Sequence, residues 1–192
     1  MGAEVEGGEK TSDMNDAKWL SKLPLDLISA ASVKHGLDAA VVAAIVWHES
    51  KGVALKTRAE VRQSQDKYLV NYRDFAERLG ISETTEKVAQ QHSWGLMQIM
   101  GYVARELGHM GYLTELLQPE LNLRYGCMKL KKLYQKYGND GDVISSYNQG
   151  GPYRTPGGMY FNQKEYVDVV SKYLRELQNA GYGPTFSGSW NG

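Results

Sequence analysis

One carboxylic acid in this sequence stands where its chemistry should differ from that of an ordinary surface glutamate. Glu49 follows the apolar run 39–47, at the last turn of a segment with strong helical character. A carboxylate at the C-terminal end of a helix faces the negative end of the helix dipole, and burial also disfavours its ionised form. We therefore expect Glu49 to have a raised pKa, which suits a general acid that works near neutral pH. The alternative is that the helix frays at His48 and leaves Glu49 in water.

Other kinds of reactive site fail on residue spacing. The pair His48-Glu49 is not a zinc-protease helix, because Gly52 stands where the second histidine ligand would be needed. The remaining histidines are scattered, and the single cysteine, Cys127, can form neither a structural zinc site nor an intrachain disulfide. The glycine-rich loop 150–158 is not followed by the lysine of a phosphate-binding loop. We expect no metal and no cofactor.

The segments that must position Glu49 are mostly helical. Asp38 is a good N-cap for the helix that carries it, and Gly52 a good stop. The final helix is expected to begin with a capping pattern formed by Asn162 and Glu165. No segment shows the alternation typical of a strand, so we predict a mainly α fold. The expected helical segments are 24–35, 38–52, 72–79, 83–91, 95–108 (a loop that enters a helix), 119–137, 142–148 and 162–181.

Length and charge limit the organisation and the partners of the chain. A chain of 192 residues predicts one domain, 18–180, between flexible tails at 1–17 and 181–192. The net charge is zero, which argues against binding nucleic acid through bulk charge. The basic helix face with Lys129, Lys131 and Lys132 is interpreted as solvated surface. The run 39–47 is too short to span a bilayer, so we expect no stable membrane insertion. The polar first residues do not look like a secretory signal.

Four short motifs occur in one order along the chain. They are Trp-His-Glu-Ser at 47–50, Ser-Trp-Gly-Leu-Met-Gln-Ile-Met at 93–100, Ser-Tyr-Asn-Gln-Gly at 146–150, and Tyr-Val at 166–167. Each is weak alone, but together they resemble the soluble lytic transglycosylase (SLT) domain family over roughly 25–178. The longer patterns at 93–108 and 162–170 look like the branch common in phages and prophages. The resemblance implies a single domain with the lysozyme-like α fold that SLT domains share with goose-type lysozymes.

The resemblance also implies a role for each matching residue. Glu49 matches the catalytic acid/base, and Ser50 the serine that follows it. The implied substrate-binding residues are Ser93, Met97, Gln98, Met100, Tyr147, Asn148 and Tyr166. Core packing is the alternative for Met97, Met100 and Tyr147. The chain departs from the family at Ser146, where alanine is usual, and in the long insertion 51–94.

The reaction that this resemblance implies needs only one carboxylate. Glu49 would protonate the oxygen of the β-1,4 bond between N-acetylmuramic acid and N-acetylglucosamine, then act as base on the C6 hydroxyl and leave a 1,6-anhydro end. A hydrolase that inverts the sugar would need a second carboxylate to activate water. Glu60, Asp66 and Asp74, in the insertion, are candidates for that role.

Two other functions stay open at this point. One is a goose-type lysozyme that adds water, and the other is a non-catalytic peptidoglycan-binding module of a phage. In each case the expected partner is the peptidoglycan glycan strand. We expect a monomer, made in the cytoplasm, that acts on the cell wall. An endolysin released by phage lysis, a part of a virion, and a host enzyme with an unrecognised export route all stay open.

Overall fold

The computed structural model describes residues 18–60 and 65–183, without the side chains of residues 65 and 66. The expected tail 1–17 and most of the expected tail 181–192 lie outside the described residues. The elements follow the chain in the order η1 (Lys18–Lys22), α1 (Leu25–His35), α2 (Ala39–Ser50), β1 (Thr57–Ala59), η2 (Gln65–Tyr68), α3 (Tyr72–Leu79), α4 (Glu83–Gln90), β2 (His92–Trp94), β3 (Ile99–Met100), α5 (Gly101–Glu106), η3 (Leu113–Leu117), α6 (Pro119–Tyr137), α7 (Asp140–Gln149), η4 (Gln163–Val167) and α8 (Asp168–Asn179). The prediction of a mainly helical domain is confirmed.

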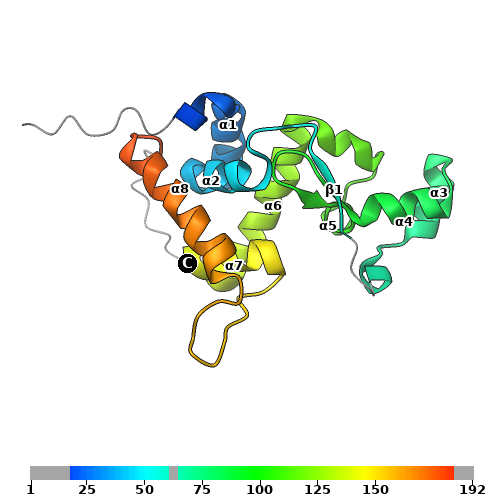
Figure 1. Ribbon diagram of the computed structural model, residues 1–192. Coiled ribbons are helices and arrows are strands. Elements are labelled where there is room, and N and C mark those ends of the chain that lie inside the picture. Colours follow the sequence, from blue (N-terminus) through cyan, green and yellow to red (C-terminus); the bar gives the residue numbers. More distant parts are fainter. Residues whose placement is uncertain (1–17, 61–64, 184–192) are drawn as a thin grey trace, which may run out of the picture.

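Helix α2 lies at the centre of the hydrophobic core. Every residue from Ala40 to Val46 is at most 2% exposed, as expected for a helix that is apolar on all sides. Figure 1 shows α8 beside α2, and α6 running behind them from α1 towards α7. Among the described residues, no helix combines the length and apolar character that crossing a membrane requires.

A small antiparallel sheet is present, although no segment shows the alternation typical of a strand. β1 pairs with β2, and β2 with β3, so that Ser93 lies opposite both Arg58 and Met100. These strands have three residues or fewer. A segment this short cannot display a recognisable alternation, and pairing with neighbouring strands decides its conformation instead.

The start of the last helix also differs from the prediction. Asn162 does not cap the helix through its side chain, and the segment Gln163–Val167 is a π-helix that leads into α8. The Asn162 amide instead donates to the Ser145 carbonyl at 3.1 Å and to Asn148 Oδ1 at 3.1 Å. Tyr182, in the expected tail 181–192, contacts α1, since its hydroxyl lies 3.1 Å from the Ser29 hydroxyl.

The insertion divides into two parts. Its first residues form β1, while α3 and α4 lie at the far end of the molecule from α8 (Figure 1). A buried ion pair joins this second part to α5: Glu86 accepts hydrogen bonds from Arg105 Nε at 2.8 Å and from Nη2 at 3.0 Å. The two side chains are 1% and 0% exposed.

The loop 150–161 projects from the body between α7 and η4 (Figure 1). An antiparallel bridge joins Arg154 and Tyr160 within it. Asp142 holds this bridge to α7, because its Oδ1 accepts from Arg154 Nη2 at 2.8 Å and from the Tyr160 hydroxyl at 2.7 Å.

Candidate active site

The end of α2 is fixed so that Glu49 stays on the helix. Asp38 caps the start, accepting from the Ala40 N–H at 2.7 Å, as predicted. At the other end, the Ser50 hydroxyl donates to the Val46 carbonyl at 3.0 Å and accepts from the Gly52 N–H at 3.2 Å. The helix therefore continues through Ser50, and the alternative in which it frays at His48 is wrong.

Gly52 is required where the chain leaves α2. Its φ is +79°, and a Cβ atom there would lie 2.3 Å from the carbonyl oxygen of Lys22. Any side chain at position 52 would thus push η1 away from the segment that follows Glu49.

Glu49 is the centre of the site. Its Oε1 accepts a 2.6 Å hydrogen bond from the Tyr166 hydroxyl. Burial raises the pKa of Glu49 above its ordinary value, and the bond from Tyr166 and the charges of Lys129, Arg58 and Lys56 oppose that rise. The predicted raised pKa is confirmed, and it favours a protonated carboxyl that can donate to a substrate.

The segment 93–98 forms a hydrogen-bonded turn that is joined to Lys56. Gln98 has a φ of +46°, and all its side-chain groups are engaged. Its Oε1 accepts from the Ser93 hydroxyl at 3.0 Å, and its amide nitrogen donates to the carbonyls of Gly95 at 2.9 Å and Lys56 at 3.1 Å. Because the Lys56 ammonium donates to the Glu49 carbonyl, the turn and the end of α2 are joined through one residue.

Met97 and Tyr147 meet inside the protein. Met97 is fully buried, its N–H donates to Asn122 Oδ1 at 2.7 Å, and its carbonyl accepts from the Tyr147 hydroxyl at 2.9 Å. Gly126 leaves room for Met97, since a Cβ atom at position 126 would lie 2.0 Å from the methionine sulfur. Met97 and Tyr147 thus have the surroundings expected for core packing, whereas Met100 is half-buried.

Of the last two predicted site residues, Tyr166 of η4 contacts Glu49, whereas Asn148 of α7 is held by Asn162. Asn148 is exposed, and its Oδ1 is held by the Asn162 amide. Tyr166 is 3% exposed and lies edge-on to the His48 ring, with 4.6 Å between the ring centroids. Burial and the neighbouring Lys51 and Lys56 lower the pKa of His48 to about 4, so this imidazole is neutral at pH 7.

The interpretation of Lys129 as part of a solvated helix face is wrong. Its ammonium does not lie on a solvated face, because Nζ donates to the Tyr147 carbonyl at 2.7 Å and lies 3.9 Å from the centroid of the Tyr147 ring. The sequence spacing could have indicated this position. Asn122, Gly126 and Lys129 are spaced by four and three residues, which places them on one face of a helix. The first two are buried.

Two candidates for a second carboxylate, Glu60 and Asp74, have surroundings unlike those of Glu49. Glu60 accepts from Arg58 Nε at 2.6 Å, and Asp74 is exposed on α3. The side chain of Asp66 lies outside the described residues. Within the described part of the chain, the charges that act on the pKa of Glu49 are cations. Nor does any group of three histidine, cysteine, aspartate or glutamate side chains gather there as a metal site would require.

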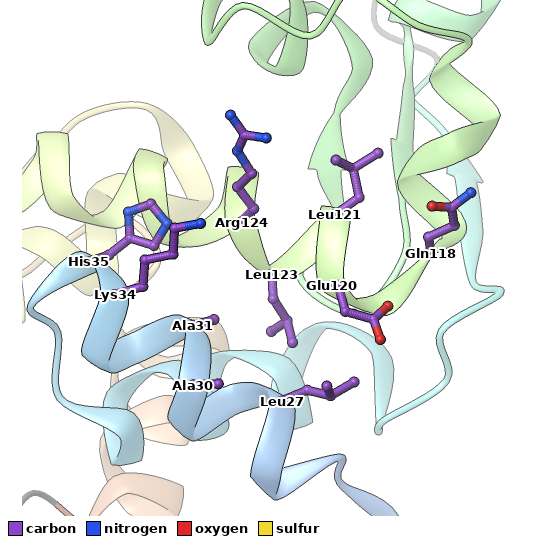
Figure 2. A pocket seen from close by; sticks show the side chains of 10 residues that line it. All are labelled: Leu27, Ala30, Ala31, Lys34, His35, Gln118, Glu120, Leu121, Leu123 and Arg124. Atoms are coloured by element: carbon purple, nitrogen blue, oxygen red, sulfur yellow. The ribbon is translucent and has the colours of Figure 1, made fainter.

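A pocket of about 400 Å³ opens between α1 and the first half of α6. Figure 2 shows Lys34, His35 and Arg124 along one side of it, and Leu27 and Glu120 along the other. It contains none of the residues around Glu49.

Comparison with known proteins agrees with the motif order. Residues 26–157 match the family model of the transglycosylase SLT domain. Protein IpgF of Shigella flexneri is 30% identical to the chain over 84 residues, which are 43% of this chain and 53% of IpgF. Protein IpgF of Shigella sonnei matches with the same values. The chain thus spans about half the length of the curated relatives it matches. No solved structure matches it at a significant level.

Proposed function

This chain belongs to the transglycosylase SLT domain family, and we propose that it is a lytic transglycosylase that cleaves the glycan strands of peptidoglycan. The observation that carries the proposal is Glu49, a carboxyl with a raised pKa that is hydrogen-bonded to Tyr166 at the end of a buried helix. The bond cleaved is the β-1,4 bond from N-acetylmuramic acid to N-acetylglucosamine.

In the first step, protonated Glu49 delivers its proton to the glycosidic oxygen as the bond to C1 of the muramic acid breaks. The resulting carboxylate keeps the Tyr166 hydroxyl as its donor. Burial raises the pKa of Tyr166 far above its ordinary value, so the phenol stays protonated throughout. Aiming a fixed donor at the group where negative charge develops is a recurrent source of transition-state stabilisation.

In the second step, the Glu49 carboxylate removes the proton of the C6 hydroxyl, whose oxygen attacks C1 and closes the 1,6-anhydro ring. Glu49 is thereby reprotonated, and no water is consumed. The cationic surroundings of Glu49 support this single-carboxylate route, since a second carboxylate would be needed to position water in an inverting hydrolase.

Asn148 is exposed, and its amide oxygen accepts from the Asn162 amide, which leaves its amide nitrogen free of that contact. We assign it to the acetamido group of the sugar.

Mass spectrometry of the fragments released from purified peptidoglycan tests the reaction. We expect ends that are lighter by one water than those of a hydrolytic digest prepared in parallel, and no release by the Glu49→Gln variant. Predominantly reducing muramic acid ends would instead establish a goose-type lysozyme. Binding to the wall without release of fragments would establish a non-catalytic module.

For the biological setting, we propose a protein of the phage or prophage type that acts on the cell wall after release from the cytoplasm, or within a virion. The resemblance of the patterns at 93–108 and 162–170 to that branch supports this setting. Cells that produce the protein should stay intact until their membrane is permeabilised with chloroform, and should then lyse. Lysis without permeabilisation would contradict it.

A further inference from the structure

Two successive residues of α2 contact the same tyrosine. The His48 ring meets the Tyr166 ring edge-on, with 4.6 Å between the ring centroids and 69° between the ring planes. The next residue, Glu49, accepts from the hydroxyl of that tyrosine at 2.6 Å. Tyr166 is thus held at two points, its ring by His48 and its oxygen by Glu49.

Tyr166 extends from a segment that is not regular α-helix. In η4 the N–H groups of Tyr166 and Val167 both donate to the Asn162 carbonyl, at 3.0 and 3.2 Å. Single turns of π-helix that lead into an α-helix are frequent at functional sites. The backbone still leaves a tyrosine side chain a choice of rotamers, so packing against its ring decides where its hydroxyl lies. The His48 ring provides such packing.

His48 makes this contact with its ring and not through a hydrogen bond. Its buried Nδ1 has no hydrogen-bond partner in the described part of the chain. Edge-to-face pairs of flat rings have a preferred geometry and stabilise beyond the area that they bury. Burial and the nearby Lys51 and Lys56 hold the pKa of His48 at about 4, so the ring is uncharged at pH 7. A neutral ring can hold Tyr166 without adding a further cation beside Glu49.

Other charged and titratable groups act on these three side chains from the end of α2, from β1 and the loop before it, from α6 and from α7. They are Lys51, Lys56, Arg58, Lys129 and Tyr147. None of them changes in a variant at position 48, so an altered contact between Tyr166 and Glu49 in such a variant can be assigned to the His48 ring.

We propose that His48 is a positioning residue that holds the Tyr166 ring, so that the hydroxyl stays on Glu49 while this carboxyl gives up its proton and takes it back. This inference rests on the proposed function. In the first step the departing proton leaves negative charge on Glu49, and a donor that is already in place stabilises this charge without reorienting. His48 itself neither gives nor takes a proton.

Three substitutions separate the ring from the space that it fills. His48→Phe keeps a flat ring without nitrogens, His48→Leu fills the space without a flat ring, and His48→Ala removes both. His35→Ala is the matched control, because His35 is also a half-buried histidine in the last turn of a helix, and its buried Nε2 likewise has no hydrogen-bond partner in the described ranges. It lines the pocket between α1 and α6, away from the residues around Glu49.

The first measurement follows the ¹³Cζ signal of Tyr166 by NMR during a pH titration, and needs no activity. In the wild type this signal should show a step when Glu49 ionises, because the hydroxyl that bonds to the carboxyl senses its charge. His48 titrates at about pH 4 and Glu49 above its ordinary value of 4.5, so the Glu49 step comes later in the titration.

We expect this step to keep its size in His48→Phe and His35→Ala. It should shrink by roughly half in His48→Leu and His48→Ala, since the loss of an edge-to-face pair lowers the ratio of held to displaced rings by up to roughly tenfold. A step of wild-type size in His48→Leu would overturn the proposal even if His48→Ala does not fold.

The second measurement is the kcat of peptidoglycan cleavage, in a double-mutant cycle with Tyr166→Phe. Alone, His48→Leu should lower kcat by roughly tenfold, less than the roughly hundredfold that a misplaced reacting group can cost. His48→Phe should keep the wild-type kcat. Once Tyr166→Phe has removed the hydroxyl, His48→Leu should lower kcat no further.

Losses of kcat that multiply in the double variant would show that His48 acts independently of the Tyr166 hydroxyl, and would overturn the proposal. A wild-type protein that cleaves no peptidoglycan would refute the proposed function. The Tyr166 titration would still decide whether His48 holds the ring.

Discussion

The Tyr166 hydroxyl donates a 2.6 Å hydrogen bond to Glu49 Oε1 across 117 residues of sequence. This hydrogen bond directly joins the π-helix that precedes α8 to the end of α2. A hydrogen bond to the ionised form of a carboxyl stabilises that form, so Tyr166 and burial act on Glu49 in opposite directions.

Replacing Glu49 by glutamine should abolish most of the activity. The amide can still accept from Tyr166 but has no proton to give. We expect cleavage of purified peptidoglycan to fall by at least roughly a hundredfold, the low end for loss of a general acid. The folded fraction should be unchanged by circular dichroism. Near wild-type cleavage would rule out Glu49 as the acid.

Removing the Tyr166 hydroxyl should weaken the acid without removing it. In Tyr166→Phe the carboxylate loses its donor, so the pKa of Glu49 should rise further and the alkaline limit of cleavage should move to higher pH. Stability should fall by about 1 kcal/mol, the usual net value of a hydrogen bond. A pH profile that keeps its wild-type limits would show that the contact does not control Glu49.

The raised pKa of Glu49 also predicts how stability depends on pH. Between its unfolded pKa, near 4.5, and its higher folded pKa, the folded state binds more protons than the unfolded state. The contribution of Glu49 to the free energy of unfolding therefore falls as pH rises through this window and stays low above it. The difference in Tm between Glu49→Gln and wild type should accordingly increase from pH 4 to pH 8. A constant difference would show that folding does not raise the pKa of Glu49.

Tyr147→Phe separates a structural hydroxyl from a substrate contact. Because this hydroxyl donates to the buried Met97 carbonyl, its loss should lower the free energy of unfolding by about 1 kcal/mol. Activity per folded molecule should remain close to wild type. A large loss of turnover with an unchanged Tm would instead indicate that Tyr147 contacts the sugar.

Breaking the buried ion pair should be much more costly than breaking an exposed one. Glu86→Gln leaves the Arg105 charge buried without its carboxylate, which typically costs about 3–5 kcal/mol. Glu83→Gln breaks the exposed pair with Arg73 and should cost at most about 1 kcal/mol. Urea denaturation of both variants compares them directly. Equal losses in the free energy of unfolding would mean that the buried pair does not stabilise the attachment of α3 and α4 to α5.

Local patterns predicted the helix that carries Glu49, because its cap, its apolar run and its stop are all encoded within 38–52. They could not predict the sheet, whose strands exist only through pairing between distant segments. They also missed Lys129, because a lysine is usually solvated, and here the neighbouring α7 covers it. The capping pattern at Asn162 failed for a similar reason, since the side chain bonds across to α7.

The position of α8 against α2 has a consequence for the newly made chain. Translation at roughly 5–20 residues per second places about 6–23 s between Glu49 and its hydroxyl partner, which lie 117 residues apart. During that interval α2, which is apolar on all sides, has no α8 to cover it, so a ribosome-bound chain exposes apolar surface of the kind that makes incomplete chains prone to aggregate. The proposed acid is assembled late in synthesis, and a nascent chain released before Tyr166 would carry Glu49 without the contact that tunes it.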